Sequence, residues 1–144
     1  MNVDQNAPMV AYDDIWIKAD LDTVWSTLTD INNWSEWQSG VSAARLLGPL
    51  SLGVNFEWKA SGLGIKSTIR DFEPSNRIGW TGKALGMSAI HLWMLEPEAE
   101  GTHVWSEESM SGWFIRLIKI FDAGFLEKSM EASLQELKAR VENN

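Results

Sequence analysis

The chain has 144 residues, of which 44% are hydrophobic and 22% charged, and it contains no cysteine. Its length predicts one globular domain, and the lack of cysteine excludes disulfides, thiol nucleophiles and cysteine-ligated zinc. The formal net charge of −8 argues against nucleic acid as a partner and against docking on anionic lipid, because both favour clustered Lys and Arg.

The N-terminal part of the chain predicts a loose segment, one strand and two short helices. Asp20 and Asp22 follow the strand, and either carboxylate can cap the first helix. Gly40 ends the second helix. The expected segments are a loose terminus over 1–9, a single domain over 10–142 that begins with a strand over 10–19, a helix carrying Val24, Trp25 and Leu28, and a short helix over 30–38.

The middle of the chain predicts an antiparallel meander. Apolar and polar residues alternate along 54–60, as expected of a strand with one buried face. Glycine, proline and asparagine mark the turns between successive runs. The expected strands are 41–47 at the sheet edge, 54–60, 65–72, 77–83, 87–95 and 102–110.

The C-terminal part predicts one long helix from Gly112 to about residue 141. Its expected apolar stripe is Ile120, Ala123, Met130, Leu134, Leu137 and Val141. Strands gathered in one run, with the helices kept apart from them, indicate the α+β class.

Location in the cell is inferred from two segments. The first ten residues lack a basic region followed by an apolar run, so no secretory signal is expected. The most apolar stretch, 113–121, is interrupted by Arg116 and Lys119 and is too short to span a bilayer. The sequence therefore predicts a cytoplasmic protein without membrane insertion.

Hairpin turns fix the strand register, and the register decides which side chains share a face. Centring each turn gives the pairs Trp58–Ile65, Ile69–Trp80, Trp80–Ala89 and Ala89–Glu108. On this register His91 and Glu108 lie diagonally on adjacent inner-face strands, within reach of each other. The residues expected to contact a ligand are Phe56, Trp58, Ser67, Ile69, Ile78, Trp80, Trp93, Ser106 and Met130.

Several short motifs occur in an order and spacing that are specific for one fold. They are Ile15-x-Ile17-x-Ala19, Val24-Trp25, Trp34-x-x-Trp37, Glu73-Pro74, Ile78-x-Trp80-x-Gly82, Gly86, His91-x-Trp93, Gly101-Thr102-x-Val104, Glu108, Gly112 and Leu134-x-x-Leu137-Lys138. With these motifs the chain resembles the SRPBCC (START/Bet v 1-like) superfamily, and within it the bacterial polyketide cyclase/dehydrase-like branch. The resemblance implies a helix-grip fold, in which a seven-stranded antiparallel curved sheet wraps around a long C-terminal helix and encloses a cavity.

The resemblance implies no single function, since members include cyclases, lipid carriers, hormone receptors, allergens and chaperone activators. The first hypothesis is a binder of a small hydrophobic, lipid- or polyketide-like molecule. The second is a cyclase or dehydratase in which His91 and Glu108 act as an acid–base pair, with Glu108 raised in pKa by desolvation and His91 titrating near neutrality. The third is a protein-interaction module.

For the His91–Glu108 pair, a structural reading is favoured over catalysis, because hydrogen-bonded polar pairs in apolar surroundings also occur without a reaction. No cofactor is expected, and no metal site is expected from two histidines without cysteine. A weak homodimer is expected through an apolar cluster on the outer sheet face beside His103, formed by Leu92, Met94 and Trp105.

Overall fold

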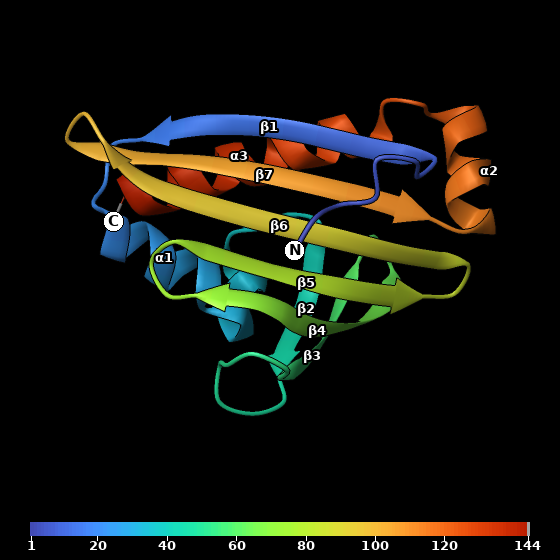
Figure 1. The fold of residues 1–144 in the computed structure, drawn as a ribbon, viewed down its shortest axis with the longest axis horizontal. Coiled ribbons are helices and arrows are strands. Elements are labelled where there is room, and N and C mark those ends of the chain that lie inside the picture. The colour runs from blue at the N-terminus through green and yellow to red at the C-terminus, as the bar shows by residue number, and fades with distance from the viewer. Residues whose placement is uncertain (144) are drawn as a thin grey trace.

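The computed structural model describes residues 1–143, in which seven antiparallel strands form one sheet in the order β1-β7-β6-β5-β4-β3-β2 (Figure 1). The expected α+β class and the strand count are confirmed, and β2 lies at the predicted edge. The strands are β1 (Met9–Ile17), β2 (Val41–Leu46), β3 (Asn55–Ala60), β4 (Leu63–Glu73), β5 (Arg77–Ala84), β6 (Met87–Glu98) and β7 (Gly101–Ser111).

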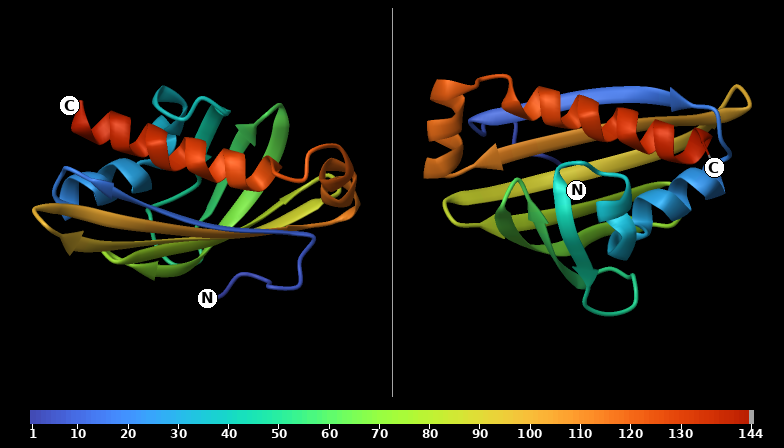
Figure 2. Two further views of the ribbon diagram at one scale, coloured as in Figure 1. Left: turned by 90° about the horizontal axis from the view of Figure 1, so that it is seen from above. Right: turned by 180° about the vertical axis from the view of Figure 1, so that it is seen from behind.

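The sheet curves, and its concave face is covered by helices (Figure 2). The helix α1 (Leu21–Thr29) begins after Asp20, whose carboxylate accepts a hydrogen bond of 2.8 Å from the backbone N–H of Thr23. A short 3-10 helix, η1 (Ile31–Glu36), follows. The long helix α3 (Phe125–Glu142) lies across the concave face and buries the stripe Leu126, Met130, Leu134, Leu137 and Val141.

The prediction of a single C-terminal helix is wrong, because the structure has two helices after β7. A separate helix, α2 (Trp113–Phe121), ends before Asp122, whose backbone angles of φ −151 and ψ 82 are not helical. The Asp122 carboxylate instead accepts hydrogen bonds from Lys128 Nζ in α3. Ile120, which was expected on the buried stripe, is 77% exposed as a result. No helix within residues 1–143 combines the length and hydropathy that crossing a bilayer requires.

Of the segment 1–9, which was expected to be loose, Met9 begins β1 and the first eight residues pack against the convex outer face of the sheet (Figure 1). Val3 is buried, and the backbone N–H of Asp4 donates a 3.0 Å hydrogen bond to Ser109 Oγ of β7. Met1 lies close to Gly79 and Leu92.

This packing covers part of the apolar cluster on which the dimer prediction rests. Leu92 is buried rather than available to a partner. Trp105 is half-buried and stacks on the His103 ring, with 4.0 Å between the ring centroids. The apolar surface left for a dimer contact is therefore smaller than the sequence indicates, and dimerisation stays a prediction.

The strand register agrees with the sequence-based one as far as β5. Trp58 pairs with Ile65 and Ile69 with Trp80, as expected. From there the predicted pairs are wrong by two residues: Trp80 lies opposite His91, and Ala89 lies opposite Met110.

The shift arises because the β5–β6 and β6–β7 turns are each centred one residue later in the chain than the sequence-based pairs imply. In the first hairpin, Ala84 and Met87 are paired, and in the second, Glu98 and Gly101 are paired. A shift of two keeps every side chain on its predicted face, because the side-chain period of a strand is two. It nevertheless moves Glu108 from a diagonal position to one directly opposite His91.

Candidate functional site

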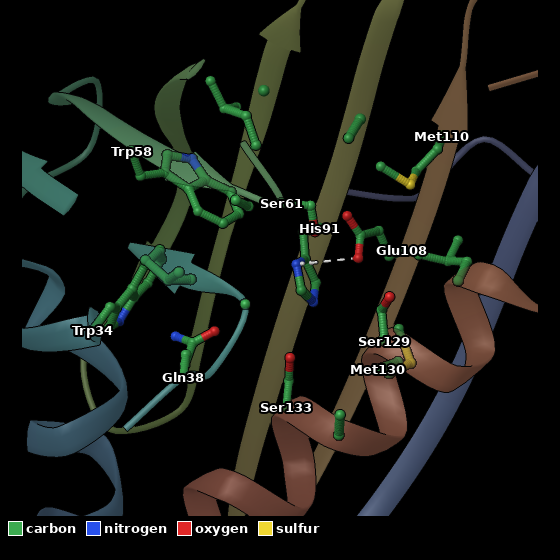
Figure 3. A pocket seen from close by; sticks show the side chains of 18 of the residues that line it. Trp34, Gln38, Trp58, Ser61, His91, Glu108, Met110, Ser129, Met130 and Ser133 are labelled. Carbon is green, nitrogen blue, oxygen red and sulfur yellow. Dashed lines mark ion pairs between the residues drawn. The ribbon is translucent and has the colours of Figure 1, made fainter. Parts of the chain in front are cut away.

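A cavity of about 400 Å³ lies between the inner face of the sheet, the segment that follows η1, and residues 125–136 of α3 (Figure 3). The sheet supplies small residues at its floor, where Gly82 of β5 pairs with Ala89 of β6. A Cβ atom on Gly82 would lie 3.0 Å from Ser67 Oγ and 3.2 Å from Ile65, so a larger residue there would crowd the floor. The hollow therefore exists because the paired positions on two neighbouring strands are occupied by small residues.

Five of the nine residues expected to contact a ligand line this cavity: Trp58, Ser67, Trp80, Trp93 and Met130. The pair His91 and Glu108 lines it as well. The other four positions do not, and they are Phe56, Ile69, Ile78 and Ser106.

These four positions are buried within the protein instead. Ile69 and Ile78 are fully enclosed in the core, and the Trp34 ring packs edge-on over Phe56 with 5.5 Å between centroids. Ser106 lies behind His91, where its Oγ is 2.8 Å from His91 Nε2. Inner-face alternation identified the right face of the sheet, but it could not show which part of that face the helices cover.

The sequence reasoning missed most of the wall opposite the sheet. That wall consists of Trp34, Gln38, Ser39 and Gly40 from η1 and the segment after it, Val41 at the start of β2, and Phe125, Leu126, Lys128, Ser129, Ala132, Ser133 and Glu136 from α3. The α3 residues recur at helical spacing around Met130, and this spacing was a usable signal. Trp34 is both buried and part of the cavity wall.

The mouth of the cavity is formed by the exposed members of this lining. They are Ser39, Gly40, Ser61, Lys128, Ser129 and Ala132. One rim contact joins two of the elements: the backbone N–H of Ser39 donates a 3.0 Å hydrogen bond to Glu136 Oε2 of α3. This contact fixes the segment after η1 against the helix on one side of the opening.

His91 and Glu108 face each other across β6 and β7, with His91 Nδ1 3.5 Å from Glu108 Oε1 (Figure 3). Their side chains are 12% and 16% exposed, and both line the cavity, so what remains accessible faces its interior. The His91 ring lies between Trp80 and Trp93, at centroid distances of 5.1 Å and 5.2 Å. The pair is therefore enclosed by aromatic rings and has little contact with bulk water.

Desolvation controls the titration of both groups, because burial disfavours their charged forms. Burial raises the pKa of Glu108 to about 8 and lowers the pKa of His91 to about 3. The expectation that His91 titrates near neutrality is wrong for this reason. At neutral pH both side chains are uncharged, and Glu108 is a carboxylic acid that can donate a hydrogen bond into the cavity.

The other polar groups of the lining lie mostly on α3, on the segment after η1 and at the mouth, and few come from the sheet. Trp58 Nε1 donates a 3.0 Å hydrogen bond to Ser67 Oγ, and this satisfies both groups within the wall. Trp93 Nε1 is buried and has no hydrogen-bond partner within residues 1–143. Gln38, Ser129 and Ser133 approach the cavity from the opposite side (Figure 3). In the part of the chain that the structure describes, no three His, Cys, Asp or Glu residues are grouped to hold a metal ion.

Comparison with known proteins places this geometry among related folds. The family model for polyketide cyclase/dehydrase and lipid transport matches residues 11–142. A hypothetical protein of Helicobacter pylori superposes with a TM-score of 0.85 at 17% identity, over 95% of this chain and 90% of that protein. No curated protein matches the sequence.

Two further structural neighbours have a named superfamily or activity. The ZhuI aromatase/cyclase of a Streptomyces species superposes with a TM-score of 0.76 at 15% identity, over 93% of each chain. A START superfamily protein of Mycobacterium smegmatis gives 0.76 at 11% identity, over 93% of this chain and 97% of that protein. At these identities the structures share a fold, and the helix-grip architecture inferred from the sequence motifs is confirmed.

Proposed function

The chain belongs to the polyketide cyclase/dehydrase and lipid transport family, and on that premise we propose that it binds a small, largely apolar molecule in the cavity. The observation that carries the proposal is a hollow of about 400 Å³, within the usual range for small-molecule sites. Such a hollow inside a close-packed domain is not needed for a surface interaction module. The cytoplasmic location and the weak homodimer remain predictions from the sequence.

The wall favours a ligand with a flat or aromatic portion. Trp34 lies 5.5 Å from Trp58 and 5.4 Å from Trp80 between ring centroids, so three indoles meet on one side of the cavity. Indole rings offer broad apolar faces for stacking. On the floor, the protonated Glu108 supplies a hydrogen-bond donor, so the ligand would place a carbonyl or hydroxyl oxygen against it.

A second candidate function is acid catalysis by Glu108. A carboxylic acid with a pKa of about 8 remains protonated at neutral pH and can protonate the oxygen of a leaving hydroxyl group. A dehydration would also need a base for the carbon-bound proton, with water and a carbon–carbon double bond as products. His91 is the adjacent acceptor, but its pKa of about 3 makes it a weak base. Ligand binding is therefore the better supported function.

Filling the cavity tests the binding proposal. Ala89→Trp places an indole on the floor between Gly82 and Met110. Ala139→Trp adds the same bulk at an exposed position of α3 outside the cavity lining and serves as the matched control. An environment-sensitive apolar dye should bind the wild type and Ala139→Trp equally and lose most of its affinity for Ala89→Trp. Equal dye binding by all three folded proteins would refute the proposed site.

Glu108→Gln separates the two candidate functions, because the amide keeps the shape and a hydrogen-bond donor but cannot transfer a proton. For a binding protein, ligand affinity should change only modestly. For an enzyme acting on a substrate identified by co-purification, the rate should fall about a hundredfold or more while binding survives. A preserved rate would exclude Glu108 as the acid.

A further inference from the structure

The helix α2 presents an unusual surface. Its side chains Trp113, Leu117, Ile120 and Phe121 are 62%, 43%, 77% and 81% exposed. They recur at intervals of three and four residues, so they form one face of the helix. Leu85 in the β5–β6 turn is 79% exposed and extends this face, since Trp113 packs against the neighbouring Gly86. We call these five residues the α2 patch.

The charge of α2 is opposite to that of the chain. Residues 113–121 contain Arg116 and Lys119 and no Asp or Glu, whereas the whole chain has a formal net charge of −8. Neither cation forms an ion pair with any residue in 1–143. The acidic residue that follows directly, Asp122, is paired with Lys128 Nζ at 2.8 Å. Two free cations therefore accompany an exposed apolar helix face.

The geometry points to an anionic phospholipid bilayer as the surface that covers the α2 patch. A helix with tryptophan, phenylalanine and aliphatic side chains on one face and cations beside it is suited to lie in the interfacial plane. Its nine residues are too few to span a bilayer, so the contact is a shallow insertion. The net charge of −8 opposes anionic lipid at long range, but the interaction depends on charges within about a Debye length, roughly 8 to 10 Å, of the surface.

A second copy of this chain fits the α2 patch less well. In a symmetric contact the same patch meets itself, so Arg116 and Lys119 would approach their counterparts. Two chains of net charge −8 also repel each other. A bilayer containing phosphatidylglycerol instead supplies both the apolar layer and the negative charge that the patch lacks.

The α2 patch adjoins the proposed binding cavity along the chain on both sides. Met87 follows the β5–β6 turn and lines the cavity, and Phe125 and Leu126 line it at the start of α3. Docking through α2 would therefore bring one end of the cavity wall to the membrane, where apolar molecules partition. A role for docking in delivering a ligand to the cavity rests on the proposed function. Docking of α2 on a bilayer does not depend on that function.

Vesicle co-sedimentation tests the inference. The wild type should bind vesicles of phosphatidylcholine and phosphatidylglycerol in equal parts more tightly than vesicles of phosphatidylcholine alone. Ile120→Ser combined with Phe121→Ser should weaken binding by about tenfold or more, because two exposed apolar side chains are lost. Leu52→Ser, which removes an exposed leucine from the β2–β3 loop, should leave binding unchanged.

A charge-reversal pair provides a matched control for the electrostatic part. Arg116→Glu combined with Lys119→Glu should weaken binding to the anionic vesicles by roughly thirtyfold or more. Lys59→Glu combined with Lys66→Glu makes the same change in net charge at exposed positions of β3 and β4 and should have a much smaller effect. Equal losses from the two pairs would overturn a specific role for α2.

Two further outcomes would also overturn the inference. One is absence of wild-type binding to the anionic vesicles. The other is a dimer in light scattering that Ile120→Ser with Phe121→Ser converts to monomer, because the patch would then be covered by a second copy. Ala89→Trp should bind vesicles as the wild type does, so failure of the cavity proposal and failure of the docking proposal remain distinguishable.

Discussion

Replacing Glu108 by glutamine should change how the stability of the protein depends on pH. Glu108 has a pKa of about 8 in the folded state, against 4.5 for an unperturbed glutamate. Between these two values the unfolded chain releases a proton that the folded protein retains. Rising pH therefore favours unfolding, and the wild type should lose stability from about pH 4.5 to pH 8.

The size of the effect follows from the two pKa values. One unit of pKa difference corresponds to about 1.4 kcal/mol. Between about pH 5 and pH 8 the free energy of unfolding of the wild type should fall relative to Glu108→Gln by roughly 3 to 4 kcal/mol. His91 acts in the opposite sense, since its lowered pKa removes stability as pH falls from 6.5 towards 3. It is present in both proteins, and its contribution largely cancels in the difference.

Urea denaturation at several pH values, followed by tryptophan fluorescence, measures this difference directly. Glu107→Gln is the matched control, because Glu107 is the adjacent residue and its side chain lies on the other face of β7. Its pH profile should follow that of the wild type. Parallel profiles for the wild type and Glu108→Gln would show that Glu108 is ionised in the folded protein across this range, and the reasoning about a neutral pair would fail.

Substitutions at three other positions have expected effects on the free energy of unfolding, each measurable by urea denaturation. Asp20→Ala removes the cap of α1 and should cost about 1 kcal/mol, whereas Asp20→Asn should retain most of the stability. Gly86→Ala puts a Cβ 2.5 Å from the Trp113 ring at a φ of +70 and should cost roughly 1 to 3 kcal/mol, and wild-type stability would contradict the packing of α2. Ser106→Ala removes the hydroxyl beside His91 Nε2 and should cost about 1 kcal/mol, so an unchanged stability would mean that this hydrogen bond contributes nothing.

The faces of the sheet could be predicted because strand alternation survives small errors in the turns. The pairing of Trp80 with Ala89 is wrong by two residues, and yet both side chains lie on the predicted face. Alternation could not predict the register of the β5–β6 and β6–β7 pairs. The tight β6–β7 turn at Ala99 and Glu100 uses two non-glycine residues with φ values of 47 and 62, and such a turn is not signalled by glycine.

The C-terminal region shows where helical periodicity is insufficient. The apolar spacing continues from α2 into α3, so it predicts one helix. The break between the two helices depends on the non-helical backbone of Asp122 and on the hydrogen bond that its carboxylate accepts from Lys128 Nζ. Likewise, the cavity is defined by contacts distant in sequence. Trp34 could be predicted to be buried, but its place in the cavity wall depends on how η1 packs on the sheet.

The central claim is that the cavity holds a small apolar molecule, and native mass spectrometry of protein purified from its own host tests it most directly. The wild type and Ala139→Trp should each carry a noncovalent adduct of the same mass, and Ala89→Trp should lack it while remaining folded. An adduct of unchanged occupancy in Ala89→Trp, or bare protein mass in all three, would contradict the claim.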